Sequence, residues 1–312
     1  MREGSVTDVP SAPVMMAVAL ARLLRDGETV FHGVASPLPM VAILLAKRLH
    51  APNLVYLNIT GSVNPQPEQL PVSTVDPALL RGTRTLVTLA DLFDLSARGR
   101  LDTVFLSGVQ IDGLGRINMS AIGDFHQPKV RLPGGAGSAA LMPTARRTIL
   151  WRTKHDRRTF VEQLDFVTAS GNVDRVVTPL CVFARREGWL EVESVHPGVE
   201  LDALREATGF PITVDERTPR TPPPSPDELT ALAARFPGRL FYLPAVSRAG
   251  EPRNAGWRGA TGRVIDLVEL YLRQHGLGAA DTALYACGHP DMVGGVRKRF
   301  RPLGFELRVE SY

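Results

Sequence analysis

The sequence contains little cysteine and no long apolar run. Only two cysteines, Cys181 and Cys287, occur in 312 residues, and neither belongs to a CxxC pair. This excludes a disulfide framework, gives no metal-binding pattern and favours a reducing, cytoplasmic location. No apolar stretch approaches the roughly 20 residues that cross a bilayer. We therefore expect no metal centre and no membrane partner.

Charge of one sign is not in excess either. The chain has 36 basic and 32 acidic residues, a formal net charge of +4, and its arginines are spread along the sequence. A nucleic-acid-binding domain usually gathers basic residues on one face. The short basic run at 297–301 is typical of a solvated helix face. We expect no nucleic-acid partner.

What the sequence does contain is an alternation of helical and β-rich segments. Apolar helices are predicted at 14–25 and 37–49 because Pro starts, apolar runs and polar ends bound them. β-rich strands are predicted at 28–34, 53–61, 103–112 and 147–153. Apolar strands separated by helices are typical of an α/β fold with an open, largely parallel sheet. A hairpin turning at Glu187-Gly188 is expected to follow.

The composition changes near residue 214. Residues 215–228 are rich in proline and predict an extended connector. Beyond it the pattern predicts a small β-α-β-α-β unit. We accordingly expect a first domain at 1–213, a connector with a short helix at 214–236, and a second unit at 237–312.

Two features of residues 105–140 suggest chemistry. The first is a glycine-rich loop ahead of a helix, whose N–H groups could hold an acyl-CoA oxyanion; it comprises Gly134, Gly135, Ala136, Gly137 and Ser138. A structural glycine turn is the alternative. The second is Asp124 with His126 in "IGDFHQPK". As a buried pair they would position a substrate or act as acid and base, or they would fix the loop by hydrogen bonds.

The order of these motifs resembles the β subunit of family I CoA-transferases, in particular the glutaconate type. "SGVQID", "GRIN", "IGDFHQPK" and "PGGAG" follow one another here as in that family. The resemblance extends through 149–169 and 194–210. It implies a heterodimer or heterotetramer with an α-type subunit, and an acyl-CoA substrate whose coenzyme A is a substrate moiety, not a bound cofactor.

The resemblance also implies a glutamate nucleophile that this chain lacks. When Ala51-Pro52 and Gly61 of "APNLVYLNITGS" are aligned with the family pattern, the glutamate position falls on Ile59. No acid occurs between 53 and 64, and Glu68 beyond them is more typical of a solvated loop. The covalent glutamyl-CoA route is therefore expected to be lost.

Short polar side chains remain in the same segment. Asn58 and Thr60 could hydrogen-bond a thioester or keto oxygen, and turn formation is an equally good account of them. One branch of the family, the β-like subunit of steroid ring-opening CoA hydrolases, also lacks the glutamate. "HPGVELDALREATGF" and "PPPSPDEL" here resemble its C-terminal end, and that branch implies an acid on the partner subunit.

The C-terminal region resembles a different family. "VSR", "YACG" and a terminal "ESY" follow the order seen at the end of ferredoxin reductase-type flavoproteins. The resemblance implies nucleotide contacts from Ser247, Arg248, Cys287, Gly288 and Tyr312. The glycine-rich phosphate turn and the flavin barrel of that family have no counterpart here, so NAD(P)H or flavin is expected only with a partner chain.

The sequence therefore predicts a β-type subunit of a heteromeric CoA-transferase-like enzyme acting on an acyl-CoA. Two alternatives remain open. One is a non-catalytic scaffold or regulatory partner of the α-type subunit. The other is a redox component whose tail docks with, or completes, a flavoprotein reductase.

Overall fold

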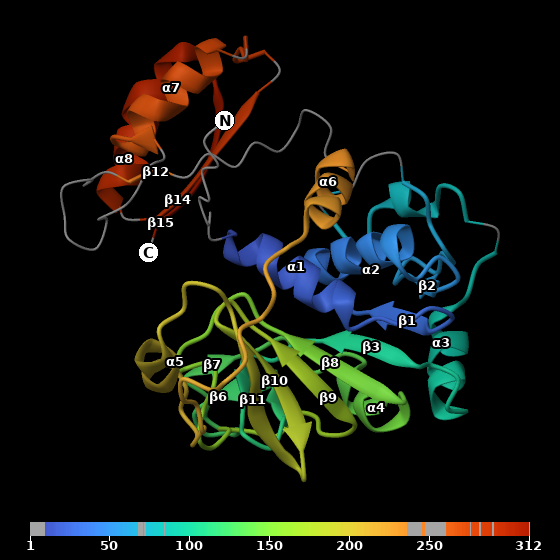
Figure 1. Cartoon of the computed structure of the whole chain (residues 1–312). Coiled ribbons are helices and arrows are strands. Elements are labelled where there is room, and N and C mark those ends of the chain that lie inside the picture. The colour runs from blue at the N-terminus through green and yellow to red at the C-terminus, as the bar shows by residue number, and fades with distance from the viewer. Residues whose placement is uncertain are drawn as a thin grey trace, which may run out of the picture. The chain divides into compact units, whose positions relative to one another are not determined.

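The computed structural model describes residues 10–67, 71, 73–83, 85–235, 245–246, 260–274, 276–280, 282–288 and 290–311. The chain divides into two compact units, Met1–Pro237 and Gly238–Tyr312. Each unit is described by itself (Figure 1). Within the described ranges, no helix has the length and apolar character needed to cross a membrane.

Unit 1 is built on one seven-stranded sheet with the order β11-β10-β9-β8-β3-β1-β2. The strands are β1 (Thr29–His32), β2 (Val55–Leu57), β3 (Thr103–Leu106), β8 (Arg147–Trp151), β9 (Val173–Val177), β10 (Cys181–Arg186) and β11 (Trp189–Val195). The neighbouring strands β2, β1, β3, β8 and β9 pair in parallel. Strand β10 is antiparallel to both of its neighbours, β9 and β11. The α/β class and the largely parallel sheet predicted from the sequence are therefore confirmed.

Helices α1 (Ala12–Arg22) and α2 (Pro37–Leu49) cover one face of this sheet (Figure 1). Proline near the start of each helix supplies a preset backbone angle where no intrahelical N–H bond is needed. Their apolar faces pack on Val30, Tyr56, Phe105 and Ile149, which point to that side of the sheet. Alternate residues of the same strands, such as Phe31, point to the other face.

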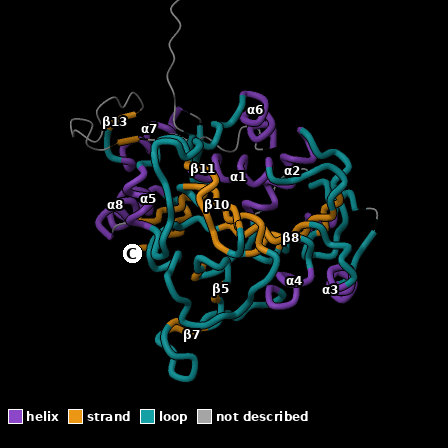
Figure 2. The backbone as a smooth tube through the Cα atoms, turned by 60° about the horizontal axis from the view of Figure 1, so that its bottom comes forward, coloured by secondary structure: helices purple, strands orange, loops and turns teal. Residues whose placement is uncertain are grey.

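The opposite face is covered by short elements from the loops. They are α3 (Leu89–Ala97), β4 (Gln110–Ile111), β5 (Ile117–Asn118), β6 (Ala121–Ile122), β7 (Val130–Arg131), α4 (Ser138–Thr144) and α5 (Leu201–Ala207), with a 3₁₀ turn at Pro77–Leu80. Figure 2 shows the β6–β7 hairpin projecting beyond the other elements of unit 1. Strands β4 to β7 and helix α4 of this layer come between β3 and β8 in the chain, whereas α3 precedes β3 and α5 follows β11.

Two predicted elements differ in detail from the structure. The strand predicted at 103–112 is broken after Leu106, because residues 110–111 leave the large sheet and pair with β5 instead. The strand predicted at 53–61 ends at Leu57 and a turn follows. The hairpin turn at Glu187-Gly188 is confirmed, and both residues have positive φ angles, 48° and 87°.

The proline-rich segment 214–225 and helix α6 (Pro226–Arg235) pack on unit 1. Arg22 of α1 forms a 2.7 Å ion pair with Glu228 and donates to the carbonyl of Pro222. Ala231 is buried among α1 and α2 residues. The connector predicted at 214–236 is thus held against the helices that cover the sheet.

The described residues of unit 2 form two pairs of parallel strands and two helices. The strands are β12 (Ala245–Val246) with β13 (Ala260–Thr261), and β14 (Ala283–Gly288) with β15 (Glu306–Ser311). Helices α7 (Val264–Gln274) and α8 (Pro290–Phe300) pack through an apolar cluster that includes Leu272, Val296 and Phe300. A 3₁₀ turn at Arg301–Leu303 leads into β15. Ion pairs from Arg299 to Glu269 and Asp266 tie the two helices together.

Candidate functional site

The direction in which the chain adds strands to the sheet reverses between β1 and β3. From β1 the chain passes through α2 on one face of the sheet to β2. From β3 it passes through the short elements on the other face to β8, which lies on the opposite side. In open α/β sheets, ligands bind outside the carboxyl ends of strands at such a point. The candidate site therefore lies where β1 ends at His32 and β3 ends at Leu106.

The segment Asn58–Ser62 follows β2, next to this switch, and forms a tight turn. Asn58 N–H donates to the Ser62 carbonyl at 2.9 Å, and Gly61 N–H donates to the Asn58 carbonyl at 2.9 Å. The Asn58 side-chain oxygen accepts from the N–H and the hydroxyl of Thr60 at 2.9 and 2.8 Å. Gly61 has a φ of +88°, and a Cβ there would meet the Val87 carbonyl at 2.7 Å. The turn is therefore fixed by residues other than Ile59.

Ile59, the residue that the sequence analysis expects at the glutamate position, lies at the tip of this turn. Its side chain is half-buried and lines a small depression with Val87, Leu89 and Leu92. Among the described residues that line the depression there is no carboxylate. The polar residues Asn58, Ser62 and Thr88 complete the lining of this depression.

Beneath the turn lies a buried chain of hydrogen bonds that the sequence did not reveal. Asn58 Nδ2 donates to the Tyr56 hydroxyl at 2.8 Å, and the hydroxyl in turn faces His32 Nε2. His32 Nδ1 lies 2.8 Å from the carbonyl of Gly33, which can only accept. Nδ1 therefore carries the proton and Nε2 accepts from Tyr56. All three side chains are nearly inaccessible to solvent, at 0 to 4% exposed.

The burial of this chain keeps its members neutral. Loss of solvent lowers the pKa of His32 to about 4, and raises the pKa of Tyr56 above its usual value. The one signal for the cluster in the sequence is a histidine ending an apolar strand and a tyrosine inside the next one. Neither pattern indicates that these two side chains, 24 residues apart in the sequence, are in contact.

The glycine loop at 133–138 presents three adjacent donors. The N–H groups of Gly135, Ala136 and Gly137 have no hydrogen-bond partner in the part of the chain that the structure describes. Ser138 does not add a free hydroxyl, because its Oγ donates to the Gly135 carbonyl at 2.6 Å. Gly134 has a φ of +91° and Ala136 a φ of +44°. Such a curved run of free N–H groups suits an anionic oxygen.

Helix α3 connects the glycine loop with the turn that carries Ile59. Its Leu89 and Leu92 line the depression beside Ile59. Its Phe93 lies against Gly137, where an added Cβ would come within 2.9 Å of the ring. This helix was not predicted from the sequence, although Thr88 and Asp91 form a capping box at its start. The two loops singled out from the sequence therefore flank one helix.

Asp124 and His126 do not form a buried pair. Both are exposed on the β6–β7 hairpin, and the Asp124 carboxylate accepts from the N–H groups of His126 and Gln127 at 2.8 and 3.0 Å. These bonds to its own loop lower the pKa of Asp124. The His126 ring packs against the edge of Phe125. The geometry thus favours the structural alternative, in which Asp124 fixes the loop.

Several residues singled out from the sequence lie outside the described residues. They are Glu68, Ser247, Arg248 and Tyr312. Cys287 and Gly288 form the end of β14, whose backbone pairs with β15 through Ser311. Searching the described residues alone, no group of three or more His, Cys, Asp or Glu side chains is placed to hold a metal ion.

Comparison with known proteins identifies the fold. The model of the family described as "Coenzyme A transferase" matches residues 14–207. The chain belongs to the coenzyme A transferase family. It is 34% identical to the B-type subunit of 3-oxoadipate CoA-transferase from Pseudomonas knackmussii, over 70% of this chain and 91% of that protein.

Two further relatives show that this family contains more than transferases. The chain is 28% identical to the cholesterol ring-cleaving hydrolase IpdB subunit of Mycobacterium tuberculosis, over 70% of this chain and 91% of the relative. Unit 1 is also similar to the crystal structure of the decarboxylase AibA/AibB. That match has a TM-score of 0.69 and 34% identity, and covers 73% of this chain and 95% of the other. This protein is therefore a β-type subunit of heteromeric CoA-transferase-like enzymes.

Proposed function

We propose that this β-type subunit forms one side of an acyl-CoA site with an α-type partner and contributes no nucleophile to the reaction. The observation that carries the proposal is Ile59. It occupies the tip of a rigid turn beside the switch between β1 and β3, and no carboxylate is among the described residues that line the depression there. A hydrocarbon side chain cannot form an acyl anhydride or a thioester with coenzyme A. The reacting acid is supplied by the partner.

The remaining groups of the chain suit binding and polarisation. The three free N–H groups at 135–137 would accept the thioester oxygen as negative charge develops on it. Thr60 donates hydrogen bonds to the side chain of Asn58, so these residues act by shaping the turn more than by contacting the substrate. The relatives named above include a transferase, a hydrolase and a decarboxylase. The missing glutamate favours hydrolysis or decarboxylation over transfer.

The test uses the complex of this chain with its α-type subunit. The complex is incubated with acyl-CoA thioesters, with and without a free carboxylate acceptor. Release of carbon dioxide and hydrolysis of the thioester are measured separately from exchange of coenzyme A. The mass of each subunit is measured by intact-mass spectrometry. We expect turnover without an enzyme-bound coenzyme A on this chain. A coenzyme A adduct on this chain would show that another residue acts as the nucleophile.

Absence of any turnover or binding of acyl-CoA would favour the scaffold alternative. In that case the chain should still raise the stability or the activity of its α-type partner. Thermal unfolding of the partner alone and in the complex separates the two outcomes. The scaffold alternative fails if the partner alone is as stable and as active as the complex.

The redox alternative for the tail is supported by the pairing of the strands in unit 2. β14 pairs in parallel with β15, whereas β12 pairs with β13. A reductase nucleotide domain without its two central strands would have this arrangement. If unit 2 completes such a domain in a partner flavoprotein, the complex should be yellow and should quench NADH fluorescence. A colourless complex that leaves NADH fluorescence unchanged would exclude it.

A further inference from the structure

The β6–β7 hairpin is short, yet it projects beyond the other elements of unit 1 (Figure 2). We call residues 121–131 the arm. Its strands pair only at Ala121 with Arg131 and at Ile122 with Val130. An isolated two-stranded hairpin is marginally stable in water. The arm therefore depends on contacts from outside its own strands.

One neighbouring segment holds the arm in a fixed shape. The Phe125 ring stacks on the Phe166 ring, with centroids 4.4 Å apart. The Arg131 guanidinium lies over the Phe125 ring, 4.8 Å from its centroid, and donates to the Phe125 carbonyl at 2.9 Å. The Asp165 carboxylate accepts from the N–H of Gly123 at 3.1 Å. Because the arm is ordered in this way before it binds anything, little conformational entropy would be lost on binding.

The arm and its supporting segment leave apolar surface in contact with solvent. Phe125 is 38% exposed, Val130 is 50% exposed, and Val167, which follows Phe166, is 44% exposed. Single exposed apolar residues are common on soluble proteins. A fixed aromatic ring with an arginine beside it is less common, and such residues carry much of the binding energy at protein interfaces. This part of unit 1 is therefore a candidate docking surface.

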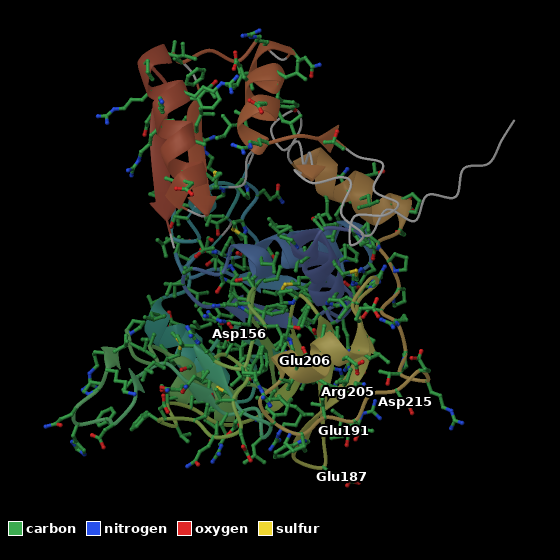
Figure 3. The ribbon with its side chains drawn as sticks, turned by 90° about the vertical axis from the view of Figure 1, so that its left-hand side faces the viewer. Asp156, Glu187, Glu191, Arg205, Glu206 and Asp215 are labelled. Atoms are coloured by element: carbon green, nitrogen blue, oxygen red, sulfur yellow. The ribbon has the colours of Figure 1, made fainter. Side chains whose placement is uncertain are left out.

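The arm also carries positive charge. Lys129 and Arg131 are exposed and form no ion pair with the residues that the structure describes. The acids nearest in sequence are occupied, because Asp124 and Asp165 accept hydrogen bonds from backbone N–H groups of the arm. A partner that fits this surface is therefore apolar with acidic residues at its rim. The labelled acids in Figure 3 lie on the side of unit 1 away from the arm; they are Glu187, Glu191, Glu206 and Asp215.

The arm leads directly into the glycine loop. The N–H of Gly134 donates to the carbonyl of Met119 at 2.7 Å, so the pairing of the two chain segments continues beyond β6 and β7. Thr168, from the segment that supports the arm, lies against Gly135, where an added Cβ would come within 2.6 Å of its methyl group. A partner whose acid reaches the free N–H groups at 135–137 is therefore adjacent to the arm.

We propose that the arm is the element through which this chain docks with its α-type subunit. The Phe125 ring enters an apolar hollow of the partner, and Lys129 and Arg131 face acidic groups around that hollow. The inference rests on the proposed function, because that function brings the partner's acid to the glycine loop. It adds the surface of this chain that holds the partner in place.

The experiment measures the dissociation constant between this chain and its α-type subunit by biolayer interferometry. Phe125→Ala should weaken the complex about 10- to 100-fold, the range for an aromatic residue at the centre of an interface. Leu49→Ala removes an apolar side chain with the same 38% exposure from the end of α2, and should change the constant by less than about twofold. Hydrogen–deuterium exchange of the amides at 123–130 should slow when the wild-type chain binds its partner.

A second variant keeps the test falsifiable if Phe125→Ala alters the shape of the arm. Lys129→Glu reverses a charge whose side chain makes no hydrogen bond or ion pair with the described residues. It should weaken the complex and reduce the dependence of binding on salt concentration. Arg48→Glu, which reverses an exposed charge on α2, is the matched control and should do neither.

Three results would overturn the proposal. The first is unchanged affinity for the partner in both arm variants. The second is loss of acyl-CoA binding at unchanged affinity for the partner, which would assign the arm to the substrate. The third is slower exchange at 123–130 only when this chain associates with a second copy of itself.

The outcomes also separate this inference from the proposed function. If the arm variants release the partner but the wild-type complex neither binds nor turns over an acyl-CoA, the docking surface stands and the proposed function is wrong. If the wild-type complex turns over an acyl-CoA without a coenzyme A adduct on this chain, and the arm variants bind the partner as tightly as the wild type, only the role of the arm is wrong.

Discussion

Tyr56 lies at the centre of a hydrogen-bond chain that runs from Asn58 through Tyr56 to His32. Its oxygen accepts a hydrogen bond from Asn58 Nδ2 and its hydroxyl donates to His32 Nε2, while the single ring N–H of His32, on Nδ1, donates to the Gly33 carbonyl. The chain joins the ends of β1 and β2 just before the turn that carries Ile59. It fixes the turn from below, without contact with solvent.

Replacement of Tyr56 by phenylalanine tests this role. The substitution keeps the ring but removes the acceptor for Asn58 and the donor for His32, and leaves these two buried groups only their long 3.4 Å contact with each other. We expect the free energy of unfolding to fall by about 1–3 kcal/mol. Urea denaturation measures it. Phe31→Leu, a change in an apolar neighbour outside the hydrogen-bond chain, serves as a comparison for general loss of packing. A Tyr56→Phe protein as stable as the wild type would contradict the assignment.

Position 59 allows a direct test of the missing nucleophile. Ile59→Glu restores the acid at the tip of a turn whose backbone is held by Asn58, Gly61 and Ser62. We expect coenzyme A transfer by the complex to rise above the wild-type level, with a coenzyme A adduct on this chain in the intact mass. Ile59→Gln has nearly the same shape without a nucleophile and should give neither. Equal activity in both variants would show that the carboxylate is not used.

At the scale of single elements, β8 depends on the ion pairs at its amino end. Arg147→Met would leave Glu28, only 12% exposed, without its ion-pair partner, whereas Asp174 would keep Arg175. Removal of one member of such a buried group costs about 3 kcal/mol. Arg146→Met, next to it, removes an arginine that is 67% exposed and paired with Asp102, and should cost less than about 1 kcal/mol. Chemical denaturation of both variants gives the comparison.

The elements that the sequence predicted well are those with a local signal. Helix α2 has its proline start and apolar face, and the β10–β11 hairpin has Glu187-Gly188 at its turn. The break after Leu106 was missed because the chain leaves the large sheet there to pair with a segment that follows it. That choice depends on tertiary pairing and not on β-propensity, which is similar on both sides of the break.

The candidate site was predicted only in part, for a similar reason. The glycine loop and the position of Ile59 are visible in the sequence because they are contiguous motifs. His32 and Tyr56 were missed because their meeting requires two parallel strands in a particular register, with Val30 opposite Tyr56.

At the scale of the whole molecule, two buried histidines, His32 and His196, and the half-buried His155 make stability depend on pH. Burial lowers the pKa of His32 to about 4, of His155 to about 3 and of His196 to about 4, from an ordinary 6.5. Below pH 6.5 the unfolded chain therefore binds more protons than the folded chain. Stability should be full above pH 6.5 and should decline as the pH falls towards about 4.

The slope of this decline can be assigned to single residues. Each buried histidine contributes up to about 1.4 kcal/mol per pH unit. His155→Gln should reduce the change in unfolding free energy per pH unit by about that amount. This effect is independent of the effect of the substitution on stability at neutral pH. His50→Gln, an exposed histidine, is the control and should leave the slope unchanged. A wild-type protein with constant stability across this range would contradict the burial of these groups.

The extent of the first unit is tested by two truncations. The chain that ends at Pro237 keeps Ala231 buried and keeps the Arg22–Glu228 ion pair, whereas the chain that ends at Thr213 loses both. It also loses Thr221, whose hydroxyl bonds to His196 at 2.9 Å. We expect the chain that ends at Pro237 to melt as a single folded unit. The chain that ends at Thr213 should have a free energy of unfolding lower by at least about 2 kcal/mol. Equal melting temperatures would place the boundary at 213.

The rigid turn after β2 has a consequence for how this family changes its chemistry. The bonds of Asn58, Gly61 and Ser62 hold the backbone, and no backbone bond depends on the side chain at 59. That position can therefore change between an acid and a hydrocarbon without refolding the loop around it. A lineage could lose or regain a covalent intermediate through a single codon, while the scaffold, the partner and the bound coenzyme stay the same. Catalytic identity is thus separated from structural integrity at one position of the chain.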